Sequence, residues 1–258
     1  MRRIGIVALL LAGTVGGTAQ AQGRGRSAPT AAALDERVRI VINGGGVFNT
    51  QTLEQQFTLR RNVEATPVST ELDPAAGGFV EVGGRIRIAP AVWVGATVFA
   101  MSASLSGTLD AQVPHPFYFG QPRDVSGEID QLSGTSKGVH VEAAFAVSSS
   151  DRREILLFGG PSYFRVKQDL VTDFTYSDAY PYDTAEFESA VTGQATDEGF
   201  GFNAGAEATW RVARSVRAGA MVRYSLANLT LAVAPGNEAD MRAGGLQVGG
   251  SVQILFGR

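Results

Sequence analysis

The chain has no cysteine, only two histidines, and no apolar run after residue 21 that approaches the length of a transmembrane helix. Without cysteine it is neither a small domain held together by disulfides nor a lipoprotein, which carries a lipid-bearing cysteine just after its signal. A membrane-spanning helix needs about 20 apolar residues, so a helical membrane protein is also excluded. The net charge of −3 offers no basic surface for nucleic acid.

The N-terminus has the three parts of a secretory signal peptide. Met1-Arg2-Arg3 is a positive segment, residues 4–11 are apolar but too short to span a bilayer, and Ala19-Gln20-Ala21 is a small-residue cleavage site. We therefore expect a cleaved signal peptide at 1–21, a flexible tether at 22–35 and one domain at 36–258; a buried N-terminal helix is the alternative.

Period-two alternation of apolar and polar residues predicts eight β-strands, because successive side chains of a strand point to opposite faces. Each has roughly the ten residues that a tilted strand needs to cross a bilayer. The predicted strands are 37–48, 79–89, 92–105, 139–147, 154–168, 199–210, 216–226 and 244–256. In the last of these, Leu246, Val248, Val252 and Phe256 share the apolar face, and Gln247 and Gln253 lie on the polar face.

The polar faces of these strands carry charges in mid-strand. In a soluble sandwich such charges would lie in solvent, but in a narrow barrel they fill the lumen and must pair. The predicted polar lumen network consists of Glu81, Arg85, Arg87, His140, Glu142, Glu207, Arg217 and Arg223. The opposite faces, predicted to meet lipid, carry many small residues, among them Gly160, Ala204 and Ala218.

The connections alternate between long and short. Segments of about 30, 30, 30 and 16 residues alternate with turns of two to six residues. Compact soluble domains rarely contain several structureless loops of this length, whereas outer-membrane barrels combine short periplasmic turns with long outer loops. An even strand number then puts both ends of the domain on the periplasmic side.

With its signal peptide, eight strands, short turns and alternating last strand, the chain resembles the small outer-membrane β-barrels of the OmpA and OmpW types over residues 36 to 258. The resemblance implies an all-β fold, an eight-stranded antiparallel up-and-down transmembrane β-barrel. In that family a final aromatic residue is read by the outer-membrane assembly machinery. Here Gly257 and Arg258 follow Phe256, which departs from the pattern.

The second long connection contains three prolines and three consecutive aromatic residues within 113–123. Proline restricts the backbone and lowers the entropy lost on ordering. The segment is a candidate contact site for a protein, sugar or lipid headgroup, with residues His115, Phe117, Tyr118, Phe119 and Arg123. The alternative is a loop packed over the barrel mouth, with its aromatic residues at the membrane interface.

The third long connection is acidic and tyrosine-rich. Its residues are Asp169, Asp173, Asp178, Asp183, Glu186, Glu188, Asp197 and Glu198 with Tyr176, Tyr180 and Tyr182. Clustered carboxylates can bind calcium, but this spacing matches no calcium loop, so we expect a solvated surface without a dedicated metal site. Neither a nucleotide motif nor a convincing Ser-His-acid group occurs, and no cofactor is expected.

The sequence therefore predicts a non-enzymatic outer-membrane barrel that supports membrane integrity or binds a ligand through its outer loops. A narrow passive channel for small solutes or ions is the main alternative; a lipid-modifying enzyme and a soluble periplasmic barrel are less favoured. The expected partners are outer-membrane lipid, lipopolysaccharide, the assembly machinery and an unidentified extracellular ligand, but not nucleic acid.

Overall fold

The computed structural model describes residues 37–234 and 237–257, so the predicted signal peptide and tether lie outside the described residues. The described chain contains ten β-strands, and every pairing between them is antiparallel. Within these residues no helix is both long enough and apolar enough to cross a membrane. The strands are β1 (Val38–Phe48), β2 (Leu53–Arg61), β3 (Glu64–Pro74), β4 (Gly77–Ala89), β5 (Val92–Pro114), β6 (Pro122–Ser149), β7 (Arg153–Asp178), β8 (Ala185–Ala213), β9 (Val216–Ala234) and β10 (Asn237–Phe256).

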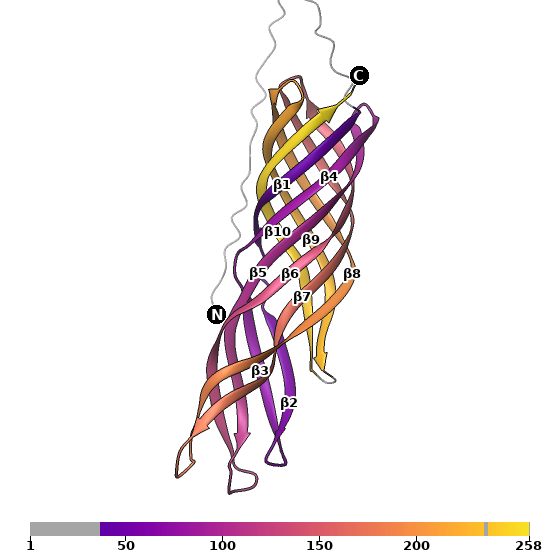
Figure 1. Ribbon diagram of the computed structural model, residues 1–258. Helices are drawn as coiled ribbons and strands as arrows, with labels where there is room; N and C mark the ends of the chain where they lie inside the picture. The colour runs from indigo at the N-terminus through magenta and orange to yellow at the C-terminus, as the bar shows by residue number, and fades with distance from the viewer. Residues whose placement is uncertain (1–36, 235–236, 258) are drawn as a thin grey trace, which may run out of the picture. The chain divides into compact units, whose positions relative to one another are not determined.

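Eight of these strands close into a ring. Its order is β5–β4–β1–β10–β9–β8–β7–β6, and the pairing of β6 with β5 completes it. Figure 1 shows this ring, with the short turns at the same end as the C-terminus. Except for residue 37, all eight predicted strands lie within the strands of the ring, so the prediction of an eight-stranded antiparallel barrel is confirmed.

The outer surface of the ring is an apolar belt. Val38 pairs with Phe256 and Ile42 with Val252, and because directly opposed residues share a face, these four side chains all point outward. They are 40 to 47 % exposed. Phe200, Phe202 and Tyr224 lie toward the end away from the short turns, and Phe145, Trp210 and Phe256 lie near the turns, which gives two aromatic bands.

The prediction that Gly160 lies on this outer face is wrong. Gly160 pairs with Asn203, which is buried and faces the lumen, so Gly160 faces the lumen as well. Gly159 and Gly160 are adjacent in β7, and neither carries a side chain that marks its face. The sequence pattern therefore cannot tell which of the two faces the lumen. Elsewhere in the ring, a paired glycine is required: a β-carbon on Gly45 would overlap the backbone of Val248 and Gly249.

The prediction of long structureless loops is also wrong. The first long segment forms the β2–β3 hairpin, and β5, β6, β7 and β8 continue well past the ring (Figure 1). We call residues 49–76, 103–133, 169–198, 228–234 and 237–245 the head. In the head, β6 no longer pairs with β7, so the four-stranded sheet β2–β3–β5–β6 and the β7–β8 hairpin are not joined by strand pairing there.

A hydrophobic core explains why the head is ordered. Leu72, Leu109, Leu170 and Leu231 are fully buried in one cluster that includes residues of the β2–β3–β5–β6 sheet and of β7 to β10. The layers approach closely: a β-carbon on Gly127 of β6 would overlap the ring of Phe187 of β8. The period-two pattern therefore continues beyond the membrane-length segments because one strand face meets this core.

The β2–β3 turn suggests a test of the hairpin. Asn62 and Val63 both have positive φ, 50° and 66°, the conformation of a type I′ turn, which suits Asn followed by Gly. A left-handed conformation costs a β-branched residue about 1–2 kcal/mol. We expect Val63→Gly to slow hydrogen exchange of the β2–β3 amides by roughly fivefold, which corresponds to about 1 kcal/mol. Asn62→Gly is the matched control and should change exchange little; equal effects of both variants would contradict this account.

Candidate functional site: the charged lumen and the head

The lumen of the ring holds polar and charged side chains together with two buried apolar clusters, one around Phe99 and Phe164 and one around Trp93 and Phe158. Of the eight residues predicted for the lumen network, seven are at most 3 % exposed, namely Glu81, Arg85, His140, Glu142, Glu207, Arg217 and Arg223. Arg87 is half-buried, and its guanidinium carbon lies 4.6 Å from the centroid of the Trp93 ring. The structure thus brings all eight to the inner side of one ring.

Five of these residues form an alternating chain of charges from four strands. Arg223 of β9 pairs with Glu81 of β4 and, at 2.5 Å, with Glu142 of β6. Arg85 of β4 pairs with Glu142 at 3.1 Å and with Glu207 of β8 at 2.6 Å. Each arginine therefore bridges two carboxylates. A buried charge stays ionised at acceptable cost only with such partners, so the chain links strands on opposite sides of the ring.

Neutral groups complete the hydrogen bonding of these carboxylates. Asn43 donates to Glu81, Ser251 donates to Glu207, and Gln253 Nε2 donates to Glu207 Oε1 at 2.7 Å. The Phe158 ring lies 5.2 Å from the Arg85 guanidinium carbon and 5.1 Å from that of Arg223. Ring faces attract guanidinium groups, so the lumen at this level is packed by both charge pairing and stacking.

A second buried ion pair was missed by sequence reasoning. Arg39 of β1 pairs with Glu154 of β7, donates to Gln253 Oε1 at 3.2 Å, and lies with its guanidinium carbon 3.8 Å from the Trp93 ring. The alternation of β1 did put Arg39 on the polar face. Glu154, however, lies next to a turn and was not assigned to the network. Gln253 contacts both Arg39 and Glu207, so it connects this pair to the central chain.

His140 belongs to a small hydrogen-bonded group next to the charged chain. Its Nδ1 shares a 2.7 Å hydrogen bond with Ser162 Oγ, and Asn203 Nδ2 donates to the same oxygen at 2.9 Å. The imidazole stacks on Phe99 with 4.2 Å between ring centroids. Both His140 and Ser162 are at most 2 % exposed. A Ser-His contact is one part of a hydrolytic site, but these two groups are sealed inside the ring.

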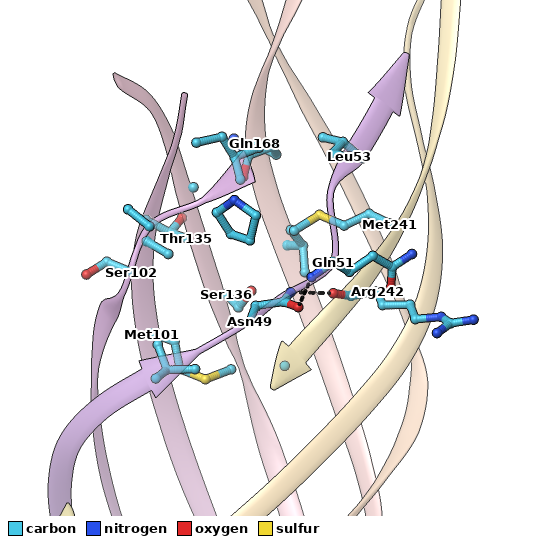
Figure 2. Close-up of a pocket in the computed structure, with 18 of the residues that line it drawn as sticks. Asn49, Gln51, Leu53, Met101, Ser102, Thr135, Ser136, Gln168, Met241 and Arg242 are labelled. Carbon is cyan, nitrogen blue, oxygen red and sulfur yellow. Dashed lines mark hydrogen bonds between the residues drawn. The ribbon is translucent and has the colours of Figure 1, made fainter. Parts of the chain in front are cut away.

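A cavity of about 60 Å³ lies where the ring meets the head (Figure 2). It is bordered by apolar side chains such as Met101 and Met241 and by polar ones such as Gln168. At this level β1 ends, and Asn49 Nδ2 donates to the carbonyl oxygen of Arg242 at 3.1 Å, as Figure 2 shows. The cavity therefore lies between the apolar cluster of the ring, which contributes Val47, Met101 and Val166 to its wall, and the apolar core of the head. Its volume suits a few water molecules.

The candidate contact site in the β5–β6 loop divides into exposed rings and buried polar groups. Phe117, Tyr118 and Phe119 are exposed, whereas His115 and Arg123 are each 6 % exposed. His115 Nδ1 accepts hydrogen bonds from the backbone N–H groups of Phe117, at 3.1 Å, and Tyr118, at 3.2 Å. The buried histidine therefore fixes the conformation of the loop that carries the rings.

Arg123 ties this loop to its neighbour. Its Nη1 donates to Asp178 Oδ2 at 2.9 Å and to the carbonyl oxygens of Tyr182 and Thr184, and its Nη2 donates to the carbonyl oxygen of Pro114. Part of the acidic third connection thus folds onto the aromatic loop. A third hairpin joins them, because Glu64 accepts a 3.0 Å hydrogen bond from the backbone N–H of Gly120. Sequence reasoning treated the two long connections separately, and only the folded tips reveal that they meet.

No protein-family model matches the chain. No curated protein matches it either. Among solved structures, it is similar to the outer membrane protein OprG from Pseudomonas aeruginosa, with 7 % identity and a TM-score of 0.44 over 86 % of this chain and 98 % of OprG. It is also similar to the outer membrane protease OmpT from Escherichia coli, with 8 % identity and a TM-score of 0.44 over 88 % and 99 %. A third is the outer membrane protein AlkL, solved in lipid bilayers, with 10 % identity and a TM-score of 0.36 over 92 % and 98 %. All three are outer membrane proteins.

The alternating chain of charges predicts strong coupling between its members. Arg223→Met leaves Glu81 and Glu142 without a shared partner, and we expect it to lower the free energy of unfolding by about 3–5 kcal/mol. In Arg223→Met/Glu81→Gln one of those carboxylates is neutral, so the loss should be smaller than the sum of the two single losses. Denaturant unfolding in lipid nanodiscs, followed by tryptophan fluorescence, measures both. Strictly additive losses would contradict the coupling.

Proposed function

We propose that this protein is an outer-membrane β-barrel whose ring spans the bilayer and whose head extends from the cell surface. The apolar belt supports the first part, because outward-facing Val, Ile and aromatic side chains suit lipid and closed pairing satisfies the backbone there. β1 contributes 11 residues to the ring, which matches the roughly 9–11 that a tilted strand needs. With the short turns on the periplasmic side, the head lies outside.

The role we propose is non-enzymatic: the protein stabilises the membrane or binds a ligand through its head. The observation that carries this proposal is the chain of ion pairs across the lumen, since a lumen filled in this way leaves the head as the accessible surface. The sealed Ser162–His140 contact supports the same choice over a hydrolase.

A narrow passive channel is the second candidate. The cavity at the junction of ring and head favours it, because this is a site where a path through the protein would begin to widen. Below the cavity, however, a solute would meet the apolar cluster around Phe99 and Phe164 and then the buried ion pairs. Above the cavity it would meet the core of the head. We therefore favour a closed barrel.

Membrane location is tested by fractionation. We expect the full chain to be recovered in the outer-membrane fraction and to migrate differently on gels with and without boiling. Val252→Arg, on the lipid face, should reduce folded yield, because an arginine near the middle of the bilayer costs about 2–4 kcal/mol. Thr58→Arg, on the exposed face of β2, is the matched control. Release of the wild-type protein by osmotic shock would contradict the membrane assignment.

Channel activity is tested by conductance in planar bilayers. We expect no steady conductance from the wild type. The variant Glu81→Ala/Arg85→Ala/Glu142→Ala/Arg223→Ala removes two charges of each sign together with their volume, and should conduct. The variant Glu81→Gln/Arg85→Met/Glu142→Gln/Arg223→Met removes the same charges but keeps most of the volume, and should stay closed. Steady conductance of the wild type would favour the passive channel.

A further inference from the structure

The tips of the head present a group of exposed aromatic rings, which we call the aromatic tip. It consists of Phe117, Tyr118 and Phe119 from the β5–β6 loop and Tyr180 from the β7–β8 loop, which are 72, 59, 81 and 87 % exposed. Figure 1 shows the two loops side by side at the end farthest from the short turns. Most other large exposed apolar side chains lie in the belt of the ring.

The aromatic tip is held in place by buried polar groups. Tyr182 joins its two halves, because its ring centroid lies 5.4 Å from that of Phe117 and 6.2 Å from that of Tyr180. Arg123 and His115 fix the backbone beneath the rings through the hydrogen bonds described above. Rings that are exposed yet already ordered lose little entropy on binding, and such residues dominate the binding energy of protein interfaces.

The charge of the head restricts what these rings can contact. The head carries eighteen carboxylates and four arginines, a net charge of −14. Two of the four arginines, Arg61 and Arg123, pair with Asp173 and Asp178. Exposed carboxylates also follow the rings in the sequence, Asp124 five residues after Phe119 and Asp183 three residues after Tyr180. Anionic surfaces are therefore repelled, and cationic ones are attracted over about a Debye length.

We propose that the aromatic tip binds an arginine- or lysine-bearing segment of a partner protein. Guanidinium and ammonium groups bind the faces of Phe and Tyr rings, and the surrounding carboxylates favour the same charge. The field of the head accelerates encounter, while the ordered rings slow dissociation. This inference deepens the proposed function, because it rests on the head being exposed at the cell surface and names the chemistry of its ligand.

The test uses the full chain in nanodiscs of zwitterionic lipid. The probes are a 12-residue peptide of alternating Arg and Gly and its Glu-Gly counterpart, with binding measured by biolayer interferometry. We expect the Arg-Gly peptide to bind and the Glu-Gly peptide not to bind. The variant Phe117→Ser/Phe119→Ser/Tyr180→Ser should raise the Kd for the Arg-Gly peptide by about tenfold, which corresponds to three exposed cation–π contacts.

Two control variants separate the rings from charge alone. Phe117→Tyr/Phe119→Tyr/Tyr180→Phe keeps every ring face and should leave the Kd within about twofold of the wild type. Glu54→Gln/Glu71→Gln/Glu128→Gln removes three exposed carboxylates from one cross-strand row of the β2–β3–β5–β6 sheet, away from the tip. It should slow association modestly and leave dissociation unchanged. If the triple serine variant does not fold, Tyr180→Ser alone should weaken binding by roughly threefold.

Three outcomes would overturn the inference. An unchanged Kd in the serine variants would show binding by diffuse charge. Equal binding of the Glu-Gly peptide would show that the charge of the ligand does not determine binding. Ring-dependent binding of a neutral oligosaccharide but not of the Arg-Gly peptide would make the tip a glycan site. Failure of the proposed function is read separately, from fractionation and conductance. Peptide binding can be measured whether or not the wild type conducts, and a chain released by osmotic shock would be assayed for peptide binding in solution instead of in nanodiscs.

Discussion

An eight-stranded ring is too narrow to leave an inward-facing charge in bulk water, and much of this structure follows from that constraint. Each charge in the lumen needs a partner on another strand. Arg85 and Arg223 meet the requirement by each bridging two carboxylates, so four strands are joined across the interior by side chains as well as around the wall by backbone hydrogen bonds. The ion pairs that offset the desolvation cost of these buried charges also close the interior.

Because the interior is closed, the head is the part of the protein that a ligand can reach. There the ring opens into a four-stranded sheet and separate hairpins, and an apolar core replaces the ion pairs. The change coincides with the ends of β1 and β4, where the β2–β3 hairpin takes over as the neighbour of β5. The ring thus combines buried ion pairs with apolar clusters, whereas an apolar core holds the head together on the same continuous strands. The charge follows this division, with the carboxylates concentrated in the head.

The ring could be predicted from sequence because each of its strands separates two unlike environments. Val38, Ile40 and Ile42 alternate with Arg39 and Asn43, and this contrast fixes both the strand and its faces. The pattern fails where side chains carry no information, as at Gly159 and Gly160. The pattern also does not show which charged residues pair with one another. Arg39 and Glu154 lie 115 positions apart and meet only through the register of the closed ring. In the head, sequence identified the aromatic residues of 117–119, but their arrangement depends on Arg123, whose burial arises from contacts with a distant loop.

The length of four strands has a mechanical consequence. β5, β6, β7 and β8 run without interruption from the short turns of the ring into the head. Their interstrand hydrogen bonds lie across the strand direction, so a pull on the tip along the strands loads many of these bonds in shear at once instead of opening them one by one. Force applied at the far end would therefore be carried into the wall of the ring before the hairpins separate.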